Sequence, residues 1–342
     1  MRTLGGSRKS LPNETNVLVA KEQAGSSIAV VDSQGNLLPA MISSAGQMAQ
    51  FAWEEFIYGK IRNPHTRAAY ERAIRRFSAH CDVLGRALRN ITPADIGCYL
   101  DSFEVKTVTK KLHLSALRHF FDQLVNRHVI VLNPASSVRT ERLQITEGQT
   151  PEISIAQARI LLQSISTNSV VGLRDQAIIA ILIYTAARVG AVAKLRIQDF
   201  CDLGDQHYLY FNEKGGKPRE IPVRHDLQFL VHGYINSAGL QFARRTTPLF
   251  RTTVRRTKLL TENGMTANDI NRMVKRRLKA ACLSTRFSPH SFRVATITDL
   301  LNQGVPLEDV QILAGHADPR TTRLYDRRDK KVTRNIVERI SI

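Results

Sequence analysis

The chain has 342 residues, which exceeds one typical domain and indicates two. Lysine and arginine number 49 against 30 aspartate and glutamate, and the net charge of +19 favours a polyanionic partner. The N-terminus lacks the apolar core of a signal peptide, and the longest apolar run, 177–183, is too short to cross a bilayer, so we expect a soluble protein. Charge alone fits nucleic-acid, ribosomal or membrane-surface binding equally.

The four cysteines lie far apart in the sequence and show no metal-ligand spacing. They are Cys81, Cys98, Cys201 and Cys282. We expect reduced, mostly buried thiols and no metal site.

The first 43 residues are polar and rich in glycine and serine, with an apolar patch at 28–31. We interpret 1–43 as a flexible leader. The alternative is a small hairpin that turns at 34–36 and contacts a partner protomer.

Residues 44–139 predict a run of helices. Asn63 and Pro64 cap and start one helix, and Thr92 to Asp95 resembles a capping box that starts the next. A further helix has a stripe of apolar residues, which are Leu114, Leu117, Phe120, Phe121 and Leu124. The cations around it either form a solvated face or, as we favour, contact a phosphate backbone; they are Lys106, Lys110, Lys111 and Arg118.

Residues 140–152 have no periodic apolar pattern, and we expect a linker there. A second domain, 153–342, opens with a capping box at Ser154 and Gln157. The helix at 175–185 is apolar on nearly every side, so we expect it at the centre of this domain. Two alternating stretches, 208–211 and 219–223, predict the strands of a hairpin. An amphipathic helix at 268–283 follows.

The stretch 289–325 carries the most informative motif. Ser288 and Pro289 start a helix with His290 and Arg293 on one face. A second short helix ends at 315–316, and Tyr325 follows nine residues after His316. Arginine grips phosphate oxygens with a planar fork, histidine donates a hydrogen bond, and tyrosine can hold a phosphate covalently. These side chains are what a protein hydroxyl needs to break a phosphodiester without a metal.

Each of these residues taken alone is more often a surface or a packing group. Tyr325 near the C-terminus most commonly is a packed aromatic side chain. Its neighbours argue for a phosphate-facing turn instead of a core, because they are charged: Arg320, Arg323, Asp326, Arg327 and Arg328.

The order His-Ser-Phe-Arg (290–293), Leu-Ala-Gly-His (313–316) and Tyr325, preceded by Arg188 in Tyr-Thr-Ala-Ala-Arg (184–188), resembles the tyrosine recombinase (phage integrase) family. The layout is similar to Xer-type enzymes. The resemblance implies a mainly α fold: an N-terminal four-helix core-binding domain and an α-rich catalytic domain with a small antiparallel β-sheet. It also implies that the two domains form a C-shaped clamp around DNA.

The resemblance implies that Tyr325 is the nucleophile and that the other catalytic residues are Arg188, Lys214, His290, Arg293 and His316. Lys217 is the less favoured candidate for the hairpin lysine. We expect further DNA contacts from the cations named above and from Lys217, Arg219, Lys275 and Arg276. Ala186 stands where the family usually has glycine, and Ala191 where an acidic residue usually braces the first arginine. Another group must therefore orient Arg188.

The chemistry explains why such a site needs these groups. Tyrosine titrates near about 10, so attack at neutral pH needs a base or a cationic pocket that stabilises phenolate. Cleavage expels a 5′ alkoxide, and a lysine whose pKa is lowered by nearby arginines can protonate it. The expected product is a 3′-phosphotyrosine with a free 5′-hydroxyl, which reseals without ATP, metal or other cofactor.

The resemblance implies a site-specific recombinase that acts on double-stranded DNA at inverted-repeat sites. We expect a homodimer on one site, a homotetramer in the synaptic complex, and a cytoplasmic, nucleoid-associated location. An apolar face at 332–340 docks either on a neighbouring protomer or on its own domain. The alternatives are a type IB topoisomerase with the same chemistry and a regulator that keeps the fold without catalysis, which Ala191 motivates.

Overall fold

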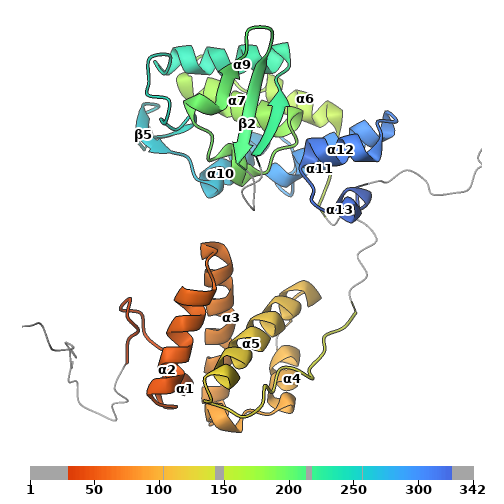
Figure 1. Ribbon diagram of the computed structural model, residues 1–342. Coiled ribbons are helices and arrows are strands. Elements are labelled where there is room, and N and C mark those ends of the chain that lie inside the picture. The colour runs from red at the N-terminus through yellow and green to blue at the C-terminus, as the bar shows by residue number, and fades with distance from the viewer. Residues whose placement is uncertain (1–29, 103, 143–149, 213–217, 256, 326–342) are drawn as a thin grey trace, which may run out of the picture. The chain divides into compact units, whose positions relative to one another are not determined.

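The computed structural model describes residues 30–102, 104–142, 150–212, 218–255 and 257–325 (Figure 1). The chain divides into two compact units, and the division falls between residues 144 and 145. This position lies inside the linker that the sequence predicts at 140–152. Each unit has a hydrophobic core of its own.

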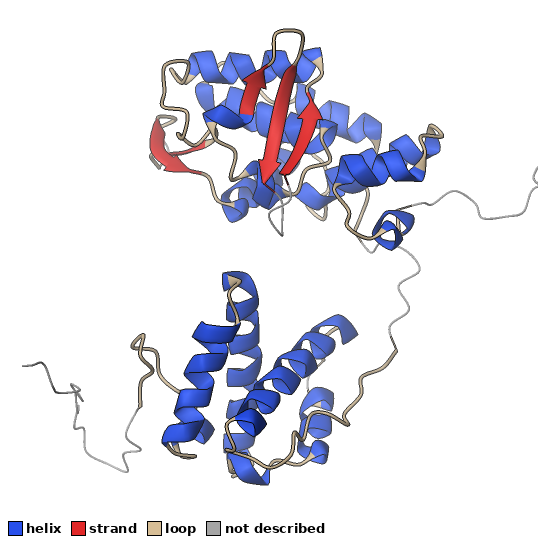
Figure 2. Cartoon of the chain, viewed as in Figure 1, coloured by secondary structure: helices blue, strands red, loops and turns tan. Residues whose placement is uncertain are grey.

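The described part of the N-terminal unit is helical apart from a bridge between Val31 and Leu37 (Figure 2). Its helices are α1 (Ala40–Ser43), α2 (Gln47–Glu54) continued by a π-helical turn (Glu55–Lys60), α3 (Pro64–Val83), α4 (Pro93–Asp101) and α5 (Thr107–Asn126), with a 3-10 turn at Leu88–Asn90. The two predicted helix starts are confirmed. The side chain of Asn63 accepts from the first amides of α3, and Thr92 forms a capping box with Asp95.

Aromatic side chains hold these helices together. The rings of Trp53 and Phe120 meet edge to face at 5.8 Å between centroids, and Phe77 meets Tyr99 in the same way at 5.1 Å. These pairs join α2 to α5 and α3 to α4. The whole predicted stripe of α5 is buried, so the prediction that α5 faces the core of this helical unit is confirmed.

The leader predicted for 1–43 is wrong for residues 30–43. The Asp32 carboxylate accepts from the amide of Asn36 at 2.8 Å and from the hydroxyl of Tyr58 at 2.7 Å. Gly35 has a φ of 77° in the turn, and Met41 and Ile42 of α1 are buried. The hairpin alternative thus fits, but the hairpin is anchored to its own unit. The sequence did not reveal this anchoring because two buried residues, Met41 and Ile42, are too few to form a periodic apolar pattern. Residues 1–29 lie outside the described part.

The second unit combines helices with two small antiparallel sheets, ordered β1-β2-β3 and β4-β5. Its elements are α6 (Ile155–Gln163), α7 (Val170–Tyr184), α8 (Val189–Val192), a 3-10 turn (Ile197–Asp199), β1 (Phe200–Asp202), β2 (His207–Asn212), β3 (Pro218–Pro222), α9 (His225–Ser237), β4 (Arg251–Thr253), β5 (Leu260–Gly264), α10 (Ala267–Ala280), α11 (Pro289–Asn302), α12 (Leu307–Ala314) and α13 (Pro319–Arg323). The predicted hairpin is β2 and β3. The other strands were not predicted.

Helix α7 is the centre of this unit, as its composition predicts. It packs against α6, α9, α10 and α11 (Figure 1). Ile178, Ile179, Ile181 and Leu182 have no exposed surface. Because α7 is held on several sides, the turn that follows it, 185–188, starts from a fixed position.

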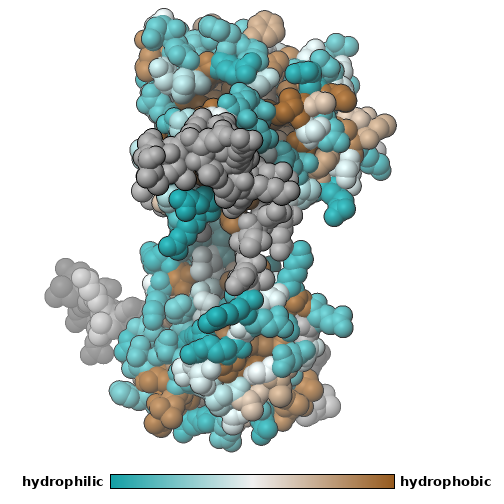
Figure 3. Space-filling view, turned by 90° about the vertical axis from the view of Figure 1, so that its right-hand side faces the viewer, coloured by the Kyte–Doolittle hydropathy of each residue, from teal (hydrophilic) through white to brown (hydrophobic). Residues whose placement is uncertain are grey.

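The surface has a different character from these cores. On the face shown in Figure 3, hydrophilic side chains predominate over both units, interrupted by small hydrophobic groups. None of the described helices combines the length and apolar character that a membrane span requires.

Candidate active site

Helix α11 presents two of the predicted site residues. Ser288 and Ser291 form its capping box, and Pro289 occupies its first turn. His290 and Arg293 follow at i and i+3, so both project toward one region. Arg293 is only 1% exposed, whereas His290 keeps contact with solvent.

Tyr325 lies against this helix with its hydroxyl oxygen 3.1 Å from Nε2 of His290. Its ring stacks on the ring of His316, with centroids 5.8 Å apart and an interplanar angle of 7°. The residue is 7% exposed, and its ring belongs to a small apolar cluster that includes Ala186, Val294 and Ile297. The prediction that charged neighbours keep Tyr325 out of a core is therefore wrong for the ring. The hydroxyl nevertheless faces polar groups.

The end of α12 fixes His316. Gly315 adopts the left-handed conformation with a φ of 62°, which ends the helix and turns the chain. The amide of His316 donates to the Gln311 carbonyl at 3.1 Å, and its Nδ1 lies 2.9 Å from Oγ1 of Thr322. His316 is thus held through both its backbone amide and its ring. Gly315, which turns the chain before it, is the sequence feature that suggests a fixed position for this histidine.

Three guanidinium groups converge on the same end of α12. Arg219 donates to the carbonyl of Leu313, Arg293 to that of Ala314 at 2.6 Å, and Arg188 to that of Gly315 at 3.4 Å. The last carbonyls of a helix have no partner within it and form the negative end of its dipole. The helix end therefore orients these three cations, which we call the arginine cluster.

The turn after α7 is tied to the same cluster. Arg219 donates to the carbonyl of Thr185 at 3.0 Å, and Arg293 donates to that of Ala186. Ala186 has a φ of 49°, a conformation that costs a non-glycine residue about 1–2 kcal/mol and explains the usual glycine at this position. Arg188 stands two residues later, and the carbonyl of Gly315 supplies an orienting contact that Ala191 cannot.

Burial and the arginine cluster both disfavour protonation of the two histidines. Burial, Arg293 and Arg188 lower the pKa of His316 to about 3. Desolvation, Arg293 and Arg188 also lower the pKa of His290. Both imidazoles are therefore neutral at pH 7. His290, which contacts the Tyr325 hydroxyl, is able to accept a proton.

The arginines themselves remain cations despite their burial. Desolvation and Arg188 lower the pKa of Arg219 to about 10. The same two causes, followed by Arg219, lower the pKa of Arg293 to about 9. At neutral pH the cluster therefore presents positive charge to any phosphate beside Tyr325.

Three residues on or beside the hairpin were predicted to lie in the site or to contact DNA, and only one of them belongs to the described residues. Lys214 and Lys217 lie outside the described residues, in the connection between Asn212 and Pro218, which pair with each other. Arg219, which we expected to contact DNA, is only 8% exposed and donates to backbone carbonyls inside the unit. The burial of β3 alternates and places Arg219 on the same inward side as Ile221. That alternation is the sequence signal that could have found it.

The cations of α10 are held by other groups. Lys275 donates to the carbonyl of Phe287 at 2.6 Å and so supports the segment before α11. Arg276 and Arg277 both donate to Oδ2 of Asp175, at 2.7 and 2.9 Å, and Arg174 binds the other oxygen. Asp175 has no exposed surface, whereas the side chain of Arg276 is 60% exposed. Arg276 therefore lies at the surface, where its expected DNA contact stays a prediction, and Lys275 has a structural contact that the sequence did not reveal.

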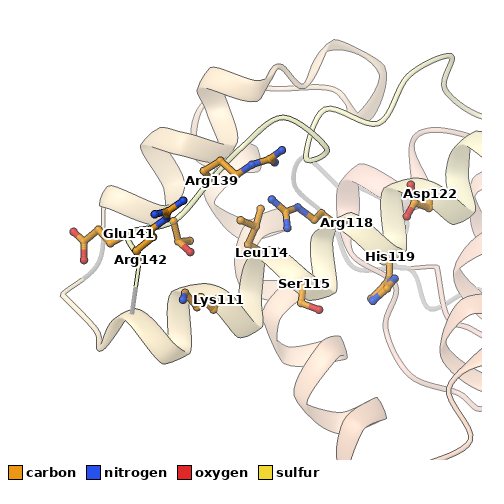
Figure 4. Close-up of a pocket in the computed structure, with 10 residues that line it drawn as sticks. Lys111, Leu114, Ser115, Arg118, His119, Asp122, Arg139, Glu141 and Arg142 are labelled. Carbon is orange, nitrogen blue, oxygen red and sulfur yellow. The ribbon is translucent and has the colours of Figure 1, made fainter. Parts of the chain in front are cut away.

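The cations of the N-terminal unit also divide into two kinds. Arg118 donates to the carbonyls of Ala135 (3.1 Å) and Val138, and so holds the segment after α5. Lys106 and Lys111 are exposed, and Lys110 is half-buried. A pocket of about 520 Å³ lies between α5 and residues 139–142 (Figure 4). Its basic lining residues are Lys111, Arg118, His119, Arg139 and Arg142.

The cysteines are all free, but only Cys81 is buried, which corrects the expectation that most are. Within the described ranges, no group of three or more His, Cys, Asp or Glu side chains is arranged to hold a metal ion.

Comparison with known proteins gives consistent matches over both units. The model of the "Phage integrase family" matches residues 153–331, and that of the "Phage integrase, N-terminal SAM-like domain" matches residues 53–128. Tyrosine recombinase XerD of Shewanella oneidensis is 28% identical over 265 residues, which cover 76% of this chain and 85% of that protein. Tyrosine recombinase XerC of Pelobacter propionicus is 29% identical over 273 residues, with 77% and 84% covered.

Two solved structures with a similar fold are complexes with DNA. XerH site-specific recombinase in a post-cleavage complex with palindromic difH substrate gives a TM-score of 0.61 at 19% identity, covering 80% of this chain and 78% of that one. A lambda integrase dimer bound to a COC′ core site gives 0.62 at 20% identity, with 82% and 77% covered. At these identities the likeness establishes a shared fold.

Proposed function

This chain belongs to the phage integrase family of tyrosine recombinases, site-specific enzymes of the Xer type that transfer DNA strands, and we propose that Tyr325 is its nucleophile. One observation carries the proposal. The Tyr325 hydroxyl lies 3.1 Å from a neutral His290, beside arginines that converge on one helix end. A nucleophile, a base and a cationic site for a phosphate are thus brought together.

Arg188 and Arg293 bind the scissile phosphate in this proposal, with His316 as a further hydrogen-bond donor. Both arginines are oriented by successive carbonyls, those of Gly315 and Ala314, before DNA binds. The pentacovalent phosphate carries more negative charge than the ground state. Fixed guanidinium groups stabilise that extra charge, and this is how they accelerate cleavage.

Cleavage requires two proton transfers, one from Tyr325 and one to the leaving 5′ oxygen. Nε2 of His290 accepts the phenolic proton as the Tyr325 oxygen forms a bond to phosphorus. The bond from phosphorus to the 5′ oxygen breaks, and Lys214 gives that oxygen a proton. The product is a 3′-phosphotyrosine and a free 5′-hydroxyl. A 5′-hydroxyl from another strand then attacks the phosphotyrosine and restores a phosphodiester.

DNA contacts outside the active site come, in this proposal, from two groups of cations. In the N-terminal unit these are Lys106, Lys110 and Lys111, with the pocket formed by α5 and residues 139–142 (Figure 4). In the second unit Arg276 and Arg277 extend from α10 and are held by Asp175. Surface cations that are already oriented lose less side-chain freedom on binding a phosphate.

We also propose the assembly that the sequence suggests. The protein binds double-stranded DNA in this proposal, with a dimer on each inverted-repeat site and a tetramer in the synaptic complex. Lambda integrase, which shares the fold, has been solved as a dimer on a core site and as a tetramer on a Holliday junction. The segment 332–340, for which we expect a docking role, lies outside the described residues.

The two alternatives are less well supported. A type IB topoisomerase shares the chemistry, but the relatives are named recombinases and the N-terminal unit matches a phage integrase domain. Loss of catalysis is motivated by Ala191. The carbonyl of Gly315 contacts Arg188 in place of an acid, and the pair of Tyr325 and His290 is intact.

A nicked suicide substrate that carries the enzyme's site tests the proposal. Wild-type protein should form a covalent adduct, and Tyr325→Phe should bind the same DNA without forming one. Recombinants from a two-site substrate distinguish a recombinase from a topoisomerase, which relaxes any supercoiled plasmid. Persistent gel shifts with no adduct from wild type would instead establish a DNA-binding regulator.

A further inference from the structure

Arg219 lies outside the motifs that indicate the family, and the DNA contact expected of it does not explain its buried position. It lies on β3 with 8% of its surface exposed and donates to the carbonyls of Thr185 and Leu313. Each of these carbonyls stands three residues before a proposed catalytic residue, Arg188 in one case and His316 in the other. One guanidinium therefore bridges the two segments that carry them.

The sheet fixes the direction of this side chain. Arg219 pairs across the strands with Phe211 of β2, and its guanidinium lies over the Phe211 ring at 5.0 Å from the centroid. Phe211 is itself 1% exposed and part of the core. The orientation of Arg219 is thus set by the same two strands whose connection, 213–217, contains Lys214.

Burying the charge of Arg219 raises the free energy of the folded protein. A buried cation is expensive to desolvate, and Arg188 and Arg293 are two like charges in the same cluster. Arg219 is one of the charges that lower the pKa of Arg293 and of His316. An apolar residue on the inward side of β3 would support the core at lower cost, which points to a role in the reaction.

We propose that Arg219 is a positioning residue for DNA cleavage: it ties the strand that follows Lys214 to the segments carrying Arg188 and His316. Through these bridges Arg188 and His316 keep a fixed relation to one phosphate. The proposal rests on the function assigned to those two residues above. Arg219 itself acts through them and is not required to touch DNA.

Single-turnover cleavage of the suicide substrate, measured over a range of DNA concentrations, tests this role with Arg219→Lys and Arg219→Met. We expect the rate constant at saturating DNA to fall about 100-fold in both variants, as for a displacement of about 1 Å in a site. The half-saturating DNA concentration should change less than about twofold, because the surface cations are intact. The fraction of substrate cleaved should stay near that of wild type.

Arg224→Met is the matched control. Arg224 also lies over an aromatic ring, that of Tyr184 at 4.7 Å, but it is exposed and pairs with Asp226. Its replacement should leave the rate constant unchanged. Near-normal cleavage by Arg219→Lys would show that charge alone suffices and would overturn the positioning role. A lower cleaved fraction at an unchanged rate constant would also overturn it, since that result means loss of folded protein.

The test of Arg219 can fail independently of the test of the proposed nucleophile. An adduct formed by Tyr325→Phe would remove the proposed function, whatever the Arg219 variants do. If Tyr325→Phe forms none and the Arg219 variants cleave at the normal rate, only the inference about Arg219 fails.

Discussion

Nε2 of His290, in the first turn of α11, lies 3.1 Å from the hydroxyl oxygen of Tyr325. The apolar cluster around the tyrosine ring and the stacking of that ring on His316 hold the ring in place, with the hydroxyl beside this imidazole. A packed ring with a polar oxygen at its edge is a well-oriented nucleophile.

The pH dependence of cleavage should report the neutral state of His290. Desolvation, Arg293 and Arg188 lower the pKa of this imidazole, so it remains a base below the ordinary value of about 6.5. The cleavage rate at subsaturating DNA should therefore stay level from pH 8 to below 6.5 and decline only at lower pH. His290→Gln should be slower by about 10²–10⁴-fold and lose this acid limb. An acid limb of wild type centred above 6.5 would contradict the assignment.

The stability of the DNA-free protein should fall on acidification because of His316. Its folded pKa is about 3, below the unfolded value of about 6.5, so below pH 6.5 the unfolded state binds more protons. The contribution of this group is complete above pH 6.5 and is lost as the pH falls toward 3. The free energy of unfolding, measured with urea at pH 7 and pH 5, should decline less in His316→Asn than in wild type. Equal declines would show that His316 titrates normally.

Asp175 should be a major source of stability for the second unit. Its carboxylate is fully buried and binds Arg174, Arg276 and Arg277, so Asp175→Asn leaves these cations without their shared anion. We expect the free energy of unfolding to fall by about 3–5 kcal/mol. Urea denaturation measures this change. The control is Asp226→Asn, which breaks an exposed pair with Arg224 and should cost less than about 1 kcal/mol. Similar losses in both variants would contradict the buried network.

Lys214 should act as the acid that protonates the leaving 5′ oxygen. Lys214→Ala should cleave ordinary DNA about 10²–10⁴-fold more slowly. A substrate with sulfur in place of that bridging oxygen expels a thiolate, whose conjugate acid has a pKa near about 8.5 and which needs no proton. On this substrate Lys214→Ala should approach the wild-type rate, and Lys217→Ala should cleave both substrates at the wild-type rate when DNA is saturating. A defect of Lys214→Ala that persists with sulfur would assign the lysine another role.

The sequence by itself determined the features that depend on near neighbours. The caps at Asn63, Thr92 and Ser154 are hydrogen bonds between residues two or three positions apart, and the pairing of His290 with Arg293 follows from helical spacing. The order of the motifs was enough to indicate the family. Gly315 was readable as the turn before His316 for the same local reason.

Only the tertiary structure decided how the site is assembled. The carbonyl of Gly315 that contacts Arg188 is 127 residues away along the chain, and the one that Arg219 binds at Leu313 is 94 residues away. A backbone carbonyl is present in every residue, so no pattern of side chains marks which one serves as a partner. The burial of the Tyr325 ring and the anchoring of the hairpin at 30–38 likewise depend on distant segments. Local spacing chooses the chemical groups, whereas long-range packing fixes what orients them and what charge surrounds them.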